Sequence, residues 1–239
     1  MSMTADSTAI YGGRDPIECA AYTKTDAARM TGVPISTVRN WVLGRDADSR
    51  QGRAGFAPAI QLDDPTGEFL SFRNLVELHV LAAIRRDYEL KLPVVRRATQ
   101  FLRENFSFEH PLAKVQMLTD GRDLLIEHGR KLLNTSRGGQ LEMKWISACV
   151  ERIEYDKEGR LQKLYPFTTT DPARDFKAVV IDPRSQFGRP CLREVGIPTE
   201  VVMSRFAAGE RIEELAEDFG IQASLIEEAI RFEQPSRAA

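Results

Sequence analysis

Arg39 and Asn40 lie side by side in a segment with helical periodicity, and their chemistry suits the reading of DNA bases. An Arg guanidinium and an Asn amide each offer paired hydrogen-bonding groups that match guanine and adenine edges in the major groove. A loop rich in Gly and Arg follows, and its guanidinium groups could neutralise phosphates. The residues expected to contact DNA are Thr37, Arg39, Asn40, Arg45, Arg50 and Arg53.

Helices must position these residues, and a helix-turn-helix spacing occurs twice in the chain. An Ala, a Gly and a Val or Ile recur at intervals of four and six residues, as Ala28, Gly32 and Val38 and again as Ala216, Gly220 and Ile226. Each Gly is expected to end one helix, and Ser36 or Ser224 to cap the next. The second unit carries Glu227 and Glu228 at the exposed positions where the first carries Arg39 and Asn40. We therefore expect the second unit to repel phosphates and to bind protein.

The hydrophobic periodicity of the first unit predicts a buried face formed by Val38, Trp41 and Val42. The expected elements are, in order, helices at about 25–31 and 36–43, a wing-like hairpin of 60–62 and 69–72 around the turn at 63–67, and helices at about 74–86 and 93–104. A helical hairpin within a bundle is the structural alternative. The order of the helices, the basic loop and the wing favours DNA binding.

The rest of the chain predicts an α+β protein that is mainly helical. Its middle is expected to contain strands at 114–118, 123–127, 152–156 and 160–165, a helix at about 140–150, and then a strand near 178–181. The expected division is an arm (1–23), a winged helix-turn-helix domain (24–104), a small α+β module (112–172) and a C-terminal helical domain (178–239).

Two resemblances follow from these motifs. Residues 24–104, from Thr25-Asp26-Ala27-Ala28 through Val38-Arg39-Asn40-Trp41 to Leu92-Pro93-Val94-Val95-Arg96-Arg97, resemble the winged helix-turn-helix of the MerR class. That class usually continues into a long dimerising helix, which is missing here, so induction by a metal or drug does not carry over. The tail, with Ile181-Asp182-Pro183, Phe187-Gly188-Arg189-Pro190, Ile197-Pro198-Thr199 and Phe206-Ala207-Ala208-Gly209-Glu210, resembles a helical domain of prokaryotic antitoxins.

The whole chain resembles a VapB-type antitoxin of a type II toxin–antitoxin pair. This resemblance implies that the protein neutralises a PIN-type ribonuclease toxin by direct binding and represses its own operon by binding operator DNA. It departs from the family at Glu194-Val195-Gly196, where Gly-Thr-Arg is common. The main alternative is a ligand-responsive MerR-like transcription regulator without a toxin partner, whose middle module senses a small molecule.

An apolar excess on the expected helix at 199–208 suggests a contact surface for the toxin or for a second copy, so we expect a homodimer. The residues assigned to this surface are Val201, Val202, Arg205 and Phe206, with plain core packing as the alternative. An Arg inserted into the acidic metal site of the toxin could also block it; the candidates are Arg189, Arg193 and Arg237.

Composition sets the remaining limits. The 239 residues carry a net charge of −2, but residues 24–103 hold 13 Lys and Arg against 9 Asp and Glu, and residues 212–239 hold 2 against 7. This polarity is compatible with nucleic acid at one end and protein at the other. Three scattered cysteines and no apolar run of membrane-spanning length favour the cytoplasm. His79, His110 and His128 lack ligand spacing, so we expect no metal, no cofactor and no enzymatic activity.

Overall fold

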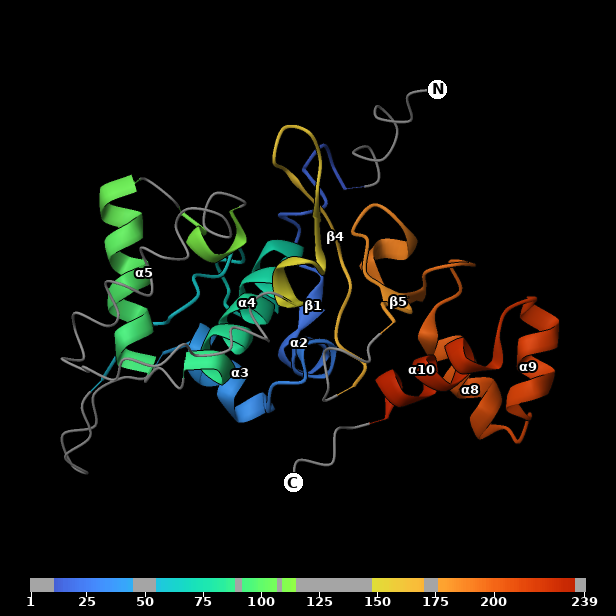
Figure 1. Cartoon of the computed structure of the whole chain (residues 1–239). Helices are drawn as coiled ribbons and strands as arrows, with labels where there is room; N and C mark the ends of the chain where they lie inside the picture. The colour runs from blue at the N-terminus through green and yellow to red at the C-terminus, as the bar shows by residue number, and fades with distance from the viewer. Residues whose placement is uncertain are drawn as a thin grey trace.

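The computed structural model describes residues 11–44, 55–88, 92–106, 109–114, 148–169 and 176–234. The fold is mixed α+β and mainly helical, as the sequence predicts, and the described strands form three two-stranded antiparallel sheets. The N-terminal helices and the C-terminal helices form neighbouring groups, with the short strands between them (Figure 1).

The helix-turn-helix of the first unit consists of α2 (Lys24–Thr31) and α3 (Ile35–Val42). The hydroxyl of Thr23 accepts a hydrogen bond from the Asp26 N–H, and the Asp26 carboxylate accepts one from the Thr23 N–H, so α2 begins with a capping box. Gly32 ends α2 at φ 65°, a left-handed conformation that suits Gly.

Helices α9 (Ile212–Phe219) and α10 (Ala223–Glu233) repeat this arrangement around Gly220 at φ 66°. The predicted Gly helix ends are therefore confirmed, but the predicted Ser caps are wrong. The helices α3 and α10 begin before Ser36 and Ser224, directly after Pro34 and Gln222, and neither start has a side-chain cap. At Pro34 the carbonyl accepts hydrogen bonds from the N–H groups of residues 37 and 38, which places the N-cap at the proline itself.

The expected wing hairpin is also wrong in its pairing. Strand β2 (Phe69–Leu70) pairs with β1 (Tyr22–Thr23), in the register Tyr22 with Leu70 and Thr23 with Phe69. The segment around Ile60 does not pair with β2. It binds the end of α3, where the N–H groups of Ala59 and Ile60 both donate to the Trp41 carbonyl, at 2.8 and 3.1 Å. The turn between the two segments does form, with Gly67 at φ 70°.

Helices α4 (Phe72–Tyr88) and α5 (Leu92–Phe106) follow and extend slightly beyond their predicted ends. Leu75, Leu78 and Leu81 on α4 are fully buried, so this helix forms the centre of the N-terminal core. A short 3₁₀ segment, η2 (Pro111–Ala113), packs against α4.

The middle of the chain contains a short β-hairpin. Strands β3 (Ile153–Tyr155) and β4 (Leu161–Leu164) pair antiparallel, which confirms the expected hairpin and its turn at Gly159. The expected strand at 123–127, all of the strand at 114–118 except its first residue, and most of the helix at 140–150 lie outside the described residues. Strand β5 (Val179–Val180) pairs with β6 (Cys191–Leu192), a strand that sequence analysis did not predict. The 3₁₀ segment η5 (Gln186–Gly188) lies between them.

Two hydrophobic cores hold these elements together. The larger one combines α2, α3 and α4 with β3, β4 and β5, and it includes Ile17 and Tyr22 from the expected N-terminal arm. The smaller one is formed by α8 (Thr199–Ala207), α9 and α10. Helix α10 contributes to both cores, because Ile226 and Ile230 are in the smaller core whereas Phe232 is in the larger one.

Candidate nucleic-acid and partner interfaces

The α3 helix exposes Arg39 and Asn40 because its opposite face is held in the core. Val38, Trp41 and Val42 are at most 4% exposed, as their spacing predicts. Arg39 and Asn40 are both exposed, and Arg39 makes no ion pair with any described residue. The two side chains are therefore available to a ligand while their backbone is fixed.

Helix α5 contributes to this surface in a way that sequence analysis missed. The Arg96 guanidinium donates from Nη2 to the Asn40 carbonyl at 3.2 Å and lies 3.8 Å from the centroid of the Phe56 ring. This contact joins the exposed end of α3 to α5. The neighbouring basic residues around Arg96 could have indicated that α5 takes part in this surface. Which helix they would contact depends on tertiary packing.

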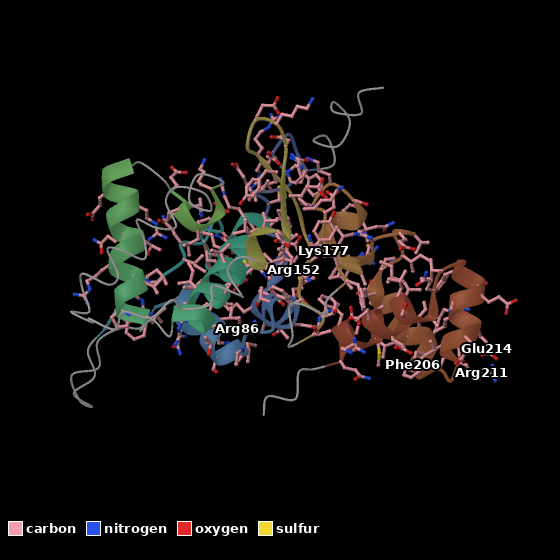
Figure 2. All side chains as sticks on the ribbon, in the orientation of Figure 1. Arg86, Arg152, Lys177, Phe206, Arg211 and Glu214 are labelled. Carbon is pink, nitrogen blue, oxygen red and sulfur yellow. The ribbon has the colours of Figure 1, made fainter. Side chains whose placement is uncertain are left out.

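Thr37, the third predicted residue on α3, is half-buried beside a hollow of about 280 Å³. Arg85 and Arg86 of α4 also line this hollow, and the Arg85 guanidinium lies 5.6 Å from the centroid of the Trp41 ring. Figure 2 shows Arg86 near the end of α4 next to α3. The predicted loop residues Arg45, Arg50 and Arg53 lie outside the described residues.

The second helix-turn-helix unit presents less acidic surface than expected. Glu227 is exposed, but Glu228 is 5% exposed, so its predicted exposure is wrong. The Thr168 hydroxyl donates to one Glu228 oxygen and the Arg231 guanidinium donates to the other. Glu228 is buried because α10 packs the face that carries it against the segment after β4. A periodic pattern in the sequence cannot show which neighbour will cover a helix face.

The apolar surface expected on α8 is smaller than the sequence suggested. Val202 is fully buried in the smaller core, whereas Val201 is 39% exposed and Phe206 is half-buried against that core. The prediction that Val202 belongs to an exposed apolar surface is therefore wrong. Figure 2 shows Phe206 on the lower side of the C-terminal helices.

Arg205 holds α8 and α9 together. Its guanidinium donates to the Glu210 carboxylate from Nε at 2.8 Å and to Asp218 from Nη1 at 2.5 Å, and it lies 5.0 Å from the Phe219 ring centroid. These acidic partners raise the pKa of Arg205 further, so the group stays charged.

Among the Arg candidates for toxin blocking, Arg189 pairs with Glu200 at 2.7 Å, Arg193 is exposed, and Arg237 lies outside the described residues.

A buried ionic cluster joins three segments of the N-terminal core, and sequence analysis did not find it. His110 lies between two carboxylates, with Nε2 3.1 Å from Asp63 and Nδ1 3.0 Å from Glu77. Burial alone would lower the pKa of His110, but hydrogen bonds to both carboxylates and the Glu77 charge raise it to about 9. The available signal was Glu77, a charged residue among the buried leucines of α4.

The same cluster keeps Asp63 ionised. Burial by itself would raise the pKa of this carboxyl group, but hydrogen bonds from His110, Ser71 and Arg73 lower it to about 2. His110 is therefore a buried imidazolium between two carboxylates, an arrangement that fixes η2 against α4.

Within the described ranges, no group of three or more His, Cys, Asp or Glu side chains is arranged to hold a metal ion. No helix in that part of the chain is long and apolar enough to cross a membrane.

Comparison with known proteins finds similarity over nearly the whole chain. Residues 179–232 match the family described as "Protein of unknown function (DUF433)". The "Putative antitoxin VapB45" of Mycobacterium tuberculosis is 26% identical over 231 residues, which cover 87% of this chain and 92% of that protein. The "Uncharacterized protein Rv2308" of the same organism is 25% identical over 229 residues, 91% of this chain and 92% of that protein.

The fold has also been seen in a crystal. The structure of Rv2018 from Mycobacterium tuberculosis matches with a TM-score of 0.64 and 23% identity, and the match covers 89% of this chain and 98% of that one. The MerR-like assignment of the first unit stays a prediction. Over most of its length, the chain is similar to a protein named as an antitoxin and has the fold of Rv2018.

Proposed function

We propose that this chain is the antitoxin of a type II toxin–antitoxin pair, which binds operator DNA through α3 and neutralises a partner toxin by direct binding. The observation that carries the DNA-binding half is the pair Arg39 and Asn40, exposed on a helix whose other face is locked in the core. Side chains that read bases need such a rigid support, because a flexible support would lose conformational entropy when it becomes ordered on DNA.

The toxin-binding half rests on similarity over most of the chain to a protein named as an antitoxin. The VapB-type resemblance adds that the toxin is a PIN-type ribonuclease. We place its binding surface on the C-terminal helices around Val201 and Phe206, where apolar side chains remain partly exposed. The proposed role is one of binding, it assigns no enzymatic step to the chain, and it is exercised in the cytoplasm by a homodimer.

Gel-shift titration with operator DNA tests the DNA-binding half. The double variant Arg39→Ala/Asn40→Ala should lose about 1 to 3 kcal/mol for each base contact and should discriminate less between sequences. Arg50→Ala or Arg53→Ala should weaken binding to all sequences alike. Arg211→Ala is the matched control, since Arg211 is an exposed guanidinium at the far end of the C-terminal helices (Figure 2). A double variant that binds the operator as tightly and as selectively as the wild type contradicts the assignment.

Co-expression with the product of the neighbouring gene tests the toxin-binding half. The wild type should restore growth, stop RNA cleavage in extracts and co-purify with that product. Phe206→Glu should weaken the complex, because a carboxylate would be placed in a desolvated apolar contact. This variant is interpreted only if its melting curve matches that of the wild type. A wild type that gives no protection overturns the antitoxin role and leaves the alternative of a transcription regulator without a toxin.

A further inference from the structure

A cavity of about 460 Å³ lies between the first helix-turn-helix and the end of α10. Ala28, Val33 and Ile35 line it from the α2–α3 unit, and Phe167 and Phe232 line it from the segment after β4 and from α10. Small-molecule sites typically have volumes of about 300 to 1,000 Å³, mostly apolar walls and a position between packed units. This cavity has all three properties.

The charged groups at the cavity leave hydrogen-bond donors unused. Both oxygens of Glu233 accept hydrogen bonds, from the Thr199 hydroxyl at 2.5 Å and from Arg29 Nη1 at 2.5 Å. Glu228 does not line the cavity but pairs with Arg231, and both its oxygens likewise accept, from Thr168 and from Arg231 Nη1. Arg29 and Arg231, by contrast, each donate through Nη1 alone within the described part of the chain. The guanidinium groups of Arg29 and Arg231 therefore still have N–H donors to offer an acceptor.

We propose that this cavity binds a small molecule with an apolar body and one carboxylate. The body would pack against the rings of Phe167 and Phe232, and the carboxylate would accept hydrogen bonds from the remaining nitrogens of Arg29 and Arg231. Guanidinium groups bind carboxylates strongly because their paired N–H donors match the two oxygens. An amine could not accept hydrogen bonds from these donors once protonated, and a neutral hydrocarbon would leave them without a partner from the ligand.

This site is separate from the surfaces assigned to DNA and toxin. Neither Arg39, Asn40 nor Phe206 lines the cavity, so the inference does not rest on the proposed function. Both its walls belong to the described residues, and its two aromatic rings come from distant parts of the sequence.

Calorimetric titration of the full-length protein with 2-naphthoate tests the proposal, with 2-naphthamide as the neutral probe of the same shape. The wild type should bind naphthoate at a single saturable site, at least tenfold more tightly than the amide. Octanoate should compete with naphthoate, because it combines a flexible apolar body with the same charged group. Absence of saturable naphthoate binding to folded wild-type protein overturns the proposal.

Two variants locate the site. Ala28→Phe should abolish binding because its ring would occupy the cavity, and Arg231→Gln should weaken naphthoate about tenfold while leaving the amide unchanged. Arg211→Gln removes an exposed guanidinium that does not line the cavity, and it should bind both probes as the wild type does. If Ala28→Phe does not fold, the selective loss in Arg231→Gln decides alone. Naphthoate binding that is unchanged in folded Ala28→Phe, or lost equally with the amide in Arg231→Gln, contradicts the proposed site.

Discussion

At the scale of single residues, the described chain holds a buried ionic cluster in which His110 lies between Asp63 and Glu77. All three side chains are at least largely buried, with exposed fractions of 6% for His110, 13% for Asp63 and 0% for Glu77. A buried charge is costly to leave unpaired, so removal of one member should destabilise the protein more than the loss of an ordinary hydrogen bond. The cluster also makes stability depend on pH.

The first prediction concerns this pH dependence. Because the pKa of His110 rises from 6.5 to about 9 on folding, its contribution to stability is complete below pH 6.5 and is lost as the pH rises through 9. The loss should be on the order of 3 kcal/mol. The lowered pKa of Asp63 acts at the other end, with a contribution present above pH 3.8 that is lost as the pH falls through about 2.

Urea denaturation at pH 6 and pH 9 measures this effect in the wild type and in His110→Gln. The variant should be less stable at pH 6 and should lose less stability between the two pH values, because Gln does not titrate. An equal decrease for both proteins would remove His110 from the pH dependence.

At the scale of the elements, two glycines in left-handed conformations allow a contrast between backbone strain and steric clash. Gly220 ends α9 at φ 66°, and a methyl group added there would meet nothing within 4 Å. Gly188 has φ 73°, but an added Cβ would lie 2.3 Å from the hydroxyl oxygen of Tyr22, whose ring is buried in the larger core. The Tyr22 hydroxyl also donates to the Gly188 carbonyl at 3.1 Å.

The second prediction follows from this contrast. Gly220→Ala should cost about 1 to 2 kcal/mol, the penalty for a left-handed residue with a Cβ. Gly188→Ala should cost clearly more, because the buried Tyr22 ring must also move. Equilibrium denaturation of both variants checks the order, and Gly188→Ala in a Tyr22→Phe background, where the clashing oxygen is absent, should recover part of the difference. Equal losses in Gly220→Ala and Gly188→Ala would contradict the steric argument.

The same elements show which features could be predicted from the sequence. The helices and the turns at Gly32, Gly220 and Gly159 depend on neighbouring residues, so spacing and residue type were sufficient. The exposure of Arg39 followed from the buried residues around it on α3. The pairing of β1 with β2 joins residues far apart in the sequence, and a two-residue strand has too little pattern to identify its partner. Burial of Glu228 and the Asp63–His110–Glu77 cluster were missed because the partners of these residues also lie far away in the sequence.

At the scale of the whole molecule, α10 connects the two cores. Its residues Ile226 and Ile230 pack in the smaller core, whereas Phe232 packs in the larger core beneath the Arg29 guanidinium, 5.4 Å from the ring centroid. Arg29 also pairs with Glu233 at 2.5 Å, which fixes α10 to α2. The C-terminal helices therefore pack directly against the predicted DNA-reading unit.

The last prediction is that Phe232 couples the unfolding of the two cores. Phe232→Ala removes a large side chain that is 5% exposed, so it should cost about 3 to 5 kcal/mol and loosen the contact between α10 and α2. Phe219→Ala is the matched control, because Phe219 is half-buried at the edge of the smaller core and contacts Arg205. Hydrogen exchange followed by mass spectrometry should show faster exchange in α2 and α10 for Phe232→Ala, and in α8 and α9 alone for Phe219→Ala. If Phe232→Ala leaves the exchange of α2 unchanged, the two cores unfold independently and the coupling through α10 is refuted.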